Sequence, residues 1–145
     1  MSVEVDAWTA FRSQITGDSS LSSIVTTFKT GYKEEQFTPS DFPIVVLNLT
    51  GITDEERIGV PKEKIVQLSV TINGKIYNPD QAIQITDALN LDEKIKNAIE
   101  KDLQLSGNST NIFIGDTEFL QIDNDIRDLK FEVKIMTNRF TMGLR

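Results

Sequence analysis

Three acidic residues near the end of the chain are its closest approach to a chemical site. Asp123, Asp125 and Asp128 fall in one short segment, and loops supply carboxylate oxygens at such spacings to Ca²⁺ and Mg²⁺. A calcium loop also needs a glycine at its turn and a glutamate at its twelfth position, and neither is present. We therefore expect an acidic turn. A weak divalent-cation site and a metal-dependent, carboxylate-based enzyme remain as alternatives.

Two residue types that often carry catalysis or bind metals are missing from the sequence. The chain of 145 residues has no cysteine and no histidine, so it lacks a thiolate nucleophile, the usual general base near neutral pH and the commonest transition-metal ligand. A Ser-His-Asp triad cannot be built, and no glycine-rich phosphate loop or dinucleotide fingerprint occurs. We expect a protein that is not an enzyme, with no catalytic residues, no bound metal and no cofactor.

The net charge argues against tight nucleic-acid binding. Asp and Glu number 22 against 15 Lys and Arg, which gives a formal charge of −7, and the basic residues do not cluster. A protein that grips DNA needs clustered Lys and Arg to displace counterions from phosphate. An acidic wall would instead let DNA pass without sticking, because like charges repel.

Length and composition indicate one domain, residues 1–145. Hydrophobic residues make up 39% of the chain and charged residues 26%, values typical of a globular protein with a core. No apolar run approaches the roughly 20 residues that span a bilayer, and the first residues lack the basic-then-apolar order of a signal peptide. We expect no membrane association and no signal peptide.

Helical spacing of apolar residues predicts two short helices at the start of the chain. The first covers residues 5–15, ends at Gly17 and places Trp8 on its apolar stripe, where a core role or an interface anchor is open. The second begins at Asp18 or Ser19 and ends at Gly31. Its apolar stripe comprises Leu21, Ile24, Val25 and Phe28.

A third and longer helix is predicted over residues 79–105, with Asp80 as a possible start and a break near Asn90. Its second half buries one face, and Asp92 stands four residues before Lys96, the favourable order for an ion pair on a helix. That face comprises Leu91, Ile95, Ala98, Ile99 and Leu103. Gly107 is the expected left-handed residue after it.

Strand signals lie on both sides of the long helix. Residues 42–51 hold a continuous apolar run, which suits a strand covered on both faces, and residues 65–72 alternate before a turn at Asn73-Gly74. Residues 112–122 read as a strand kinked at Gly115. After a turn at 123–126, residues 127–140 alternate again. The apolar face of this closing strand comprises Leu129, Phe131, Val133 and Ile135.

The order of these elements predicts an α+β fold. We expect a single, mostly antiparallel sheet of four to five strands, with two N-terminal helices and one long helix packed on it.

Charged residues on two segments are the candidate interaction sites. Residues 53–64 mix both signs between two predicted strands. We expect an exposed, solvated loop there, and a loop that engages a partner is the functional alternative. The closing strand carries charge on the face away from its apolar side chains. The candidate interface residues are Asp54, Glu55, Glu56, Arg57, Lys130, Glu132, Lys134 and Arg139.

The layout as a whole resembles a known family. A helical pair is followed by the strand "FPIVVLNL", a charged segment, the helix "NLDEKIKNAIEKDLQLSG" and the closing "NIFIGDTEFLQIDNDIRDLKFEVKIMTNRF". This arrangement is similar to that of the tail terminator, or tail-completion, proteins of long-tailed bacteriophages, and neighbouring neck and head–tail joining proteins share it. The resemblance covers most of the chain and lies in layout, size and acidity, without a diagnostic motif.

The resemblance implies a structural virion protein assembled in the host cytoplasm. Its members form hexameric rings that cap the finished tail tube, stop tube polymerisation and meet the head–tail connector protein, while DNA passes through the ring without specific binding. They have no catalytic residues. The alternative is a small intracellular adaptor or chaperone-like protein that binds a partner through an exposed sheet edge.

Overall fold

The computed structural model describes residues 2–31, 37–57 and 62–141 of the chain. The centre of its single sheet is formed by three long antiparallel strands. They lie side by side in the order β2 (Ile44–Arg57), β3 (Lys62–Tyr77) and β6 (Ile126–Thr141). Three short strands complete the sheet: β1 (Thr27–Thr30), β4 (Asn111–Ile114) and β5 (Glu118–Gln121). β1 pairs with β2 in parallel, and β4 and β5 both pair antiparallel with β6. The predicted α+β fold is confirmed, with six strands among the described residues in place of four or five.

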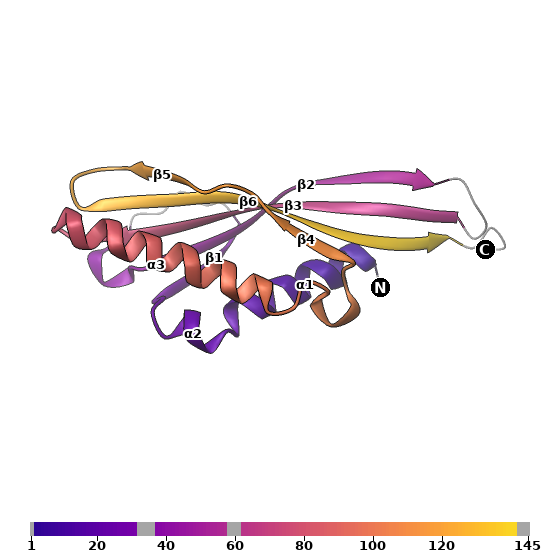
Figure 1. Ribbon diagram of the computed structural model, residues 1–145, viewed down its shortest axis with the longest axis horizontal. Helices are drawn as coiled ribbons and strands as arrows, with labels where there is room; N and C mark the ends of the chain where they lie inside the picture. The colour runs from indigo at the N-terminus through magenta and orange to yellow at the C-terminus, as the bar shows by residue number, and fades with distance from the viewer. Residues whose placement is uncertain (1, 32–36, 58–61, 142–145) are drawn as a thin grey trace.

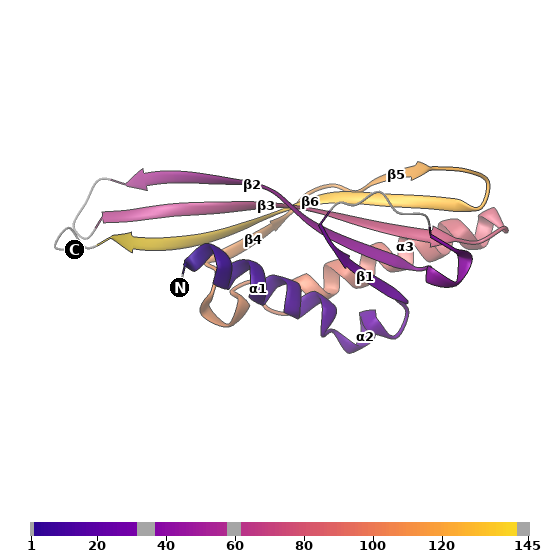
Figure 2. The ribbon, with the colours of Figure 1, turned by 180° about the vertical axis from the view of Figure 1, so that it is seen from behind.

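The three α-helices lie on one side of this sheet (Figures 1 and 2). They are α1 (Val3–Thr16), α2 (Ser19–Ser22) and α3 (Gln81–Glu100). α3 packs on β3 and β6, and α1 packs against α3 and β6. In the described part of the chain, no helix has the length and apolar character needed to cross a membrane.

The core lies between the helices and the sheet. Alternate residues of β3 and β6 are buried as predicted, and α3 and α1 each contribute one buried stripe. The main core residues are Ala7, Phe11, Ile15, Val66, Leu68, Val70, Ile72, Leu91, Ile95, Ile99, Leu129, Phe131, Val133 and Ile135. Each large apolar side chain contributes about 1.5–3 kcal/mol when fully buried. Trp8 packs against this core while remaining half-buried.

The long helix α3 is continuous through Asn90, so the predicted break is wrong. An asparagine inside a helix costs at most about 0.7 kcal/mol, which the burial of the neighbouring Leu91 outweighs. The predicted start is confirmed, because Asp80 Oδ1 accepts hydrogen bonds from the backbone nitrogens of Ala82 and Ile83. The predicted ion pair between Asp92 and Lys96 is present, with 3.2 Å between Oδ2 and Nζ.

The other end of α3 is held by α1. Gln14 Nε2 donates to the carbonyl oxygens of Ala98, Ile99 and Asp102 at 3.0, 2.9 and 3.1 Å. The last carbonyls of a helix have no partner inside the helix. The two N–H groups of this amide, shared among the three oxygens, supply donors from outside to the end of α3 and to Asp102 just beyond it. Gly107 has a φ of +93°, the left-handed conformation predicted for it, in a separate short turn.

The second predicted helix is mostly wrong. α2 begins after the N-cap Asp18 as expected but ends at Ser22, and β1 follows in its place. β1 adds to the edge of β2, where Thr27 to Thr30 lie opposite Ile44 to Leu47. The backbone hydrogen bonds of this distant partner and the β-branched residues at 25–27 favour a strand over a helix.

The predicted turn at Asn73-Gly74 is also wrong, because β3 runs straight through both residues. Gly74 lies where α3 comes closest to the sheet. A Cβ atom there would stand 2.9 Å from side-chain carbons of both Leu91 and Leu129. The glycine therefore serves close packing, a role that glycine takes inside strands.

Gly115 divides the predicted strand at 112–122 into β4 and β5, both of which pair with β6. Its backbone nitrogen donates to Glu132 O at 2.8 Å, and a Cβ atom would stand 3.0 Å from that oxygen. The interruption was expected at this residue. The alternation of apolar residues did not show that this segment pairs with β6 twice, first through β4 and then, after a gap, through β5.

Candidate functional site: a three-stranded arm

Three strands of the sheet continue side by side past α1 as an arm (Figure 1), and the base of this arm includes the buried core residues Val66, Leu68 and Ile135. We define the arm as residues 51–57 of β2, 62–69 of β3 and 134–141 of β6. The register is unbroken along it, from the row of Gly51, Ser69 and Lys134 to the pair of Lys62 and Thr141. Most of the predicted loop at 53–64 is therefore strand, and only residues 58–61 of it lie outside the described ranges.

In the described part of the chain, the outer ends of both long edges of the arm lack a neighbouring strand. β1 accompanies β2 only as far as Leu47, and β4 accompanies β6 only as far as Met136, whose carbonyl accepts a hydrogen bond from Thr110 N at 2.7 Å. Among residues 2–31, 37–57 and 62–141, no strand pairs with residues 51–57 or 137–141 on their outer sides. We call these segments the β2 edge and the β6 edge. Open edges of this kind are templates for adding another strand.

The two edges differ in charge. The β2 edge carries three acids, Asp54, Glu55 and Glu56, against the single base Arg57. The β6 edge carries the single base Arg139 and no acid, while Lys130, Glu132 and Lys134 precede it on β6. The arm thus has one acidic border, the β2 edge, and one basic border, the β6 edge with its one arginine.

The register places three of these charges in one row across the arm. Glu56 lies opposite Lys64, and Lys64 lies opposite Arg139. Lys64 also forms an ion pair with Asp54, in which Nζ and Oδ2 are 3.8 Å apart. Residues 55–57 and 139 are placed here by their backbone positions in the ladder.

The remaining candidates lie on β6 and face away from the helices. Lys130, Glu132 and Lys134 are exposed, and Lys134 Nζ lies 3.8 Å from Glu132 Oε1. Lys130 is opposite Glu118 of β5 and therefore belongs to the body of the sheet, whereas Lys134 marks the base of the arm. The structure thus groups Asp54, Glu55, Glu56, Arg57 and Arg139 on the arm and separates them from Lys130 and Glu132.

Two exposed apolar side chains beside the acidic border went unnoticed in the sequence. Ile52 is 52% exposed and Leu49 is 38% exposed on β2. A β-bulge between Leu49 and Gly51 marks the point where β2 passes from the body into the arm. Both residues fall where the strand was expected to end, so no pattern marked them as surface.

The three carboxylates near the end of the chain are not brought together. Asp123 Oδ1 accepts hydrogen bonds from the backbone nitrogens of Asp125 and Ile126 at 2.8 and 3.0 Å, which forms the predicted turn. Asp128 is paired instead with Lys75, with 2.7 Å between Oδ2 and Nζ. The described residues include no group of three or more His, Cys, Asp or Glu that could hold a metal ion.

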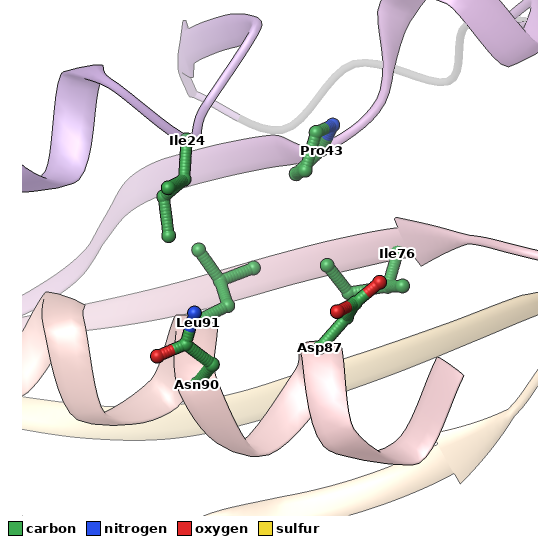
Figure 3. A pocket seen from close by; sticks show the side chains of 6 residues that line it. All are labelled: Ile24, Pro43, Ile76, Asp87, Asn90 and Leu91. Atoms are coloured by element: carbon green, nitrogen blue, oxygen red, sulfur yellow. The ribbon is translucent and has the colours of Figure 1, made fainter. Parts of the chain in front are cut away.

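A groove of about 310 Å³ lies between α3 and the segment that enters β2 (Figure 3). Its wall is apolar and comprises Ile24, Pro43, Ile76 and Leu91, while α3 contributes Asp87 and Asn90 at one side. One carboxylate and one amide over apolar side chains provide neither a nucleophile with a base nor a set of metal ligands. The groove can bury an apolar group.

Comparisons with solved structures give distant likenesses. No family model matches the chain, and no curated protein matches it. Among solved structures, a chain of the virion of the native gene transfer agent particle is similar over 90% of this chain and 93% of its own, with 7% sequence identity and a TM-score of 0.46. Both values are low.

Proposed function

We propose that this chain is a structural subunit of a bacteriophage virion, which forms a ring at the end of the tail tube as tail terminator proteins do. The observation that carries the proposal is the arm, whose two edges differ in charge and pair with no further strand among the described residues. A closed ring needs a head-to-tail contact, in which one surface of each copy meets a different surface of the next. The acidic β2 edge and the basic β6 edge supply such a pair on a single subunit.

The proposed partners are those that a ring in this position would touch. The ring is a homo-oligomer, hexameric by resemblance to the family, that caps the tail-tube protein on one side and meets the head–tail connector protein on the other. DNA passes through its opening without specific binding. The net charge of −7 supports this role, because an acidic opening repels phosphate and keeps the passing DNA from sticking.

The role requires no chemistry, and we propose that the protein is not an enzyme. Several of its carboxylates act in structural pairs. Asp18 pairs with Lys101, Asp92 with Lys96 and Asp128 with Lys75.

The test is tail-tube growth in the presence of this chain. The tube protein encoded in the same genome is polymerised with and without it, and tube lengths and ends are examined by electron microscopy. We expect shorter tubes with a ring at one end. Tubes of unchanged length with bare ends would contradict the proposal. The variant Glu93→Lys, an exposed change on α3 away from the arm, serves as a control and should cap tubes as well as the natural chain.

The adaptor function has one observation in its favour. The open β2 edge would also accept an extended peptide of a different protein, which is a common mode of recognition. An adaptor of this kind stays monomeric and leaves tube growth unchanged, so the same experiment separates the two functions.

A further inference from the structure

We propose that copies of this chain join through their arms into one continuous β-sheet, in which the β6 edge of one copy adds to the β2 edge of the next. The inference rests on the proposed ring and specifies how its subunits are held together. It names residues 137–141 on one copy and residues 51–57 on the other as the contact.

The backbone supplies the first reason. The outward N–H and C=O groups of an edge strand find no partner in their own sheet, and natural proteins usually cover, shorten or interrupt such edges. Here the two edges are the outer strands of one three-stranded arm, and neither edge contains a proline. The register of the β2–β3 pairing shifts at the base of the arm, between Leu49 and Gly51, and the described pairs from Gly51 to Arg57 follow without a break.

The strand directions fit a repeating arrangement. β2 and β6 both run antiparallel to β3, so they run parallel to each other within one arm. If neighbouring arms point the same way, the incoming β6 lies parallel to β2. β1 already pairs with β2 in parallel along Ile44 to Leu47, so the same side of β2 accepts a parallel strand nearer the body. The order β2-β3-β6 would then repeat from copy to copy.

The charges favour a second copy over other occupants. Within one arm, Glu56, Lys64 and Arg139 form a register row of one acid and two bases. If the rows of neighbouring arms stay level, the β6 edge of the next copy brings its Arg139 beside Glu56, so that Glu56 has a base on both sides. Opposite charges on paired strands stabilise a sheet and like charges destabilise it. Pairing two β2 edges would instead place acids against acids.

Exposed apolar surface lies at the β2 edge and just before it. Ile52, with 52% of its surface exposed, belongs to the β2 edge, and Leu49 precedes it at the bulge. A strand added to the β2 edge would remove part of this surface from water, which adds a hydrophobic contribution to the backbone pairing.

Engineered cysteines test the contact directly, because the natural chain has none. Glu55 and Asn138 share a register row through Ile65, so they are separated within one copy by two strand spacings, roughly 9.6 Å. A disulfide cannot span Cα atoms more than about 7 Å apart. Any bond formed in the double variant Glu55→Cys/Asn138→Cys therefore joins two copies.

We expect mild oxidation of that double variant to give a ladder of covalent oligomers extending beyond dimers. The matched controls carry one cysteine each. A 1:1 mixture of Glu55→Cys and Asn138→Cys should stop at dimers, and neither single variant should cross-link efficiently alone. A second double variant, Thr53→Cys/Asn138→Cys, tests the same contact in case neighbouring arms are offset by two residues along the strand.

Three results would overturn the proposal. One is that both double variants remain monomeric after oxidation while circular dichroism shows them folded. Another is that Glu55→Cys alone forms dimers as readily as the mixture, which would mean that β2 edges pair with each other. The third is that the chain stays monomeric and an extended peptide of another protein protects its β2 edge from hydrogen exchange. That result would assign the β2 edge to the other protein.

Charge exchange provides an independent test. The single variants Glu56→Arg and Arg139→Glu should each weaken self-association by about fivefold, the order expected when a solvent-exposed pair becomes repulsive. A 1:1 mixture of the two should associate as well as the natural chain, because every contact between unlike variants is again attractive. A mixture no better than either variant alone would contradict the pairing.

These tests are separate from that of the proposed function. A covalent ladder without capped tubes would leave the shared sheet standing and remove the terminator role. Capped tubes without a ladder would leave the terminator role standing and remove the shared sheet.

Discussion

Lys101 Nζ donates a hydrogen bond to Oδ2 of Asp18, a carboxylate whose side chain is only 3% exposed. The pair ties the N-cap of α2 to the residue that follows α3. Burial alone would raise the pKa of Asp18. The hydrogen bonds from Lys101 and from the backbone nitrogen of Leu21 outweigh it, so the pKa of Asp18 lies below its ordinary value of 3.8.

This lowered pKa predicts a loss of stability in acid. Because the folded chain holds the carboxylate charged more strongly than the unfolded chain does, Asp18 stabilises the fold above about pH 4 and ceases to do so as the pH falls through its folded pKa. Asp18→Asn keeps an N-capping side chain and should lower the free energy of unfolding near neutral pH by about 1 kcal/mol. Urea unfolding at neutral pH and near pH 3 should show the variant and the natural chain converging in acid. A constant difference would contradict the assignment, and Lys101→Met should reproduce the neutral-pH loss.

The close packing around Gly74 predicts that adding a methyl group there lowers the free energy of unfolding. Gly74→Ala places a methyl group 2.9 Å from side-chain carbons of Leu91 and Leu129, so α3 or the two leucines must shift. We expect a loss of about 1–3 kcal/mol in the free energy of unfolding. Gly51→Ala is the matched control within the same sheet, because nothing lies within 4 Å of its added atom. Equal unfolding midpoints for the two variants would show that the close approach of α3 is not as described.

Gln14 predicts that α1 stabilises the end of α3. Gln14→Leu keeps a side chain of similar size but leaves the carbonyls of Ala98, Ile99 and Asp102 without the amide donor. The expected loss is about 2 kcal/mol, since unsatisfied, partly buried acceptors are costly. The exposed neighbour on the same helix, Arg12→Gln, should change stability by less than about 0.5 kcal/mol. Hydrogen exchange at the last turn of α3 should rise in the first variant only.

Ile52 predicts a change in association without a change in fold. Because Ile52 is 52% exposed on the single chain, Ile52→Ser should alter the free energy of unfolding of the monomer by less than about 0.5 kcal/mol. It should nevertheless weaken self-association, measured by sedimentation over a range of concentrations. Phe113→Ser removes a side chain of similar exposure from β4, outside the arm, and should leave association unchanged. Equal effects of the two variants would point to general surface hydrophobicity instead of the arm.

The sequence was most informative where one face of an element is buried. The alternation of Leu129, Phe131, Val133 and Ile135 predicted β6, and the stripe on α3 predicted the helix that covers it. The arm was missed because the residues toward its end do not alternate between apolar and polar types. The run "TDEER" therefore has no apolar alternation and reads as a loop, and only its pairing with β3 makes it a strand.

Long-range partners explain the other differences. β1 is a strand because Ile44 to Leu47 lie beside it, and no local pattern within residues 27–30 identifies that partner. Gly74 reads as part of a turn in isolation and becomes a packing glycine only when Leu91 and Leu129 are placed around it. The charged candidates were identified by type, but their separation into an acidic and a basic border depends on the register of three strands.

The most direct test of the account is the native mass of the unmodified chain over a wide concentration range. Head-to-tail contacts between arms predict one discrete closed oligomer, six copies if it follows the resembled family, with few species between it and the monomer. A chain that stays monomeric at every concentration, or that forms dimers and nothing larger, would contradict a ring built from two unlike edges.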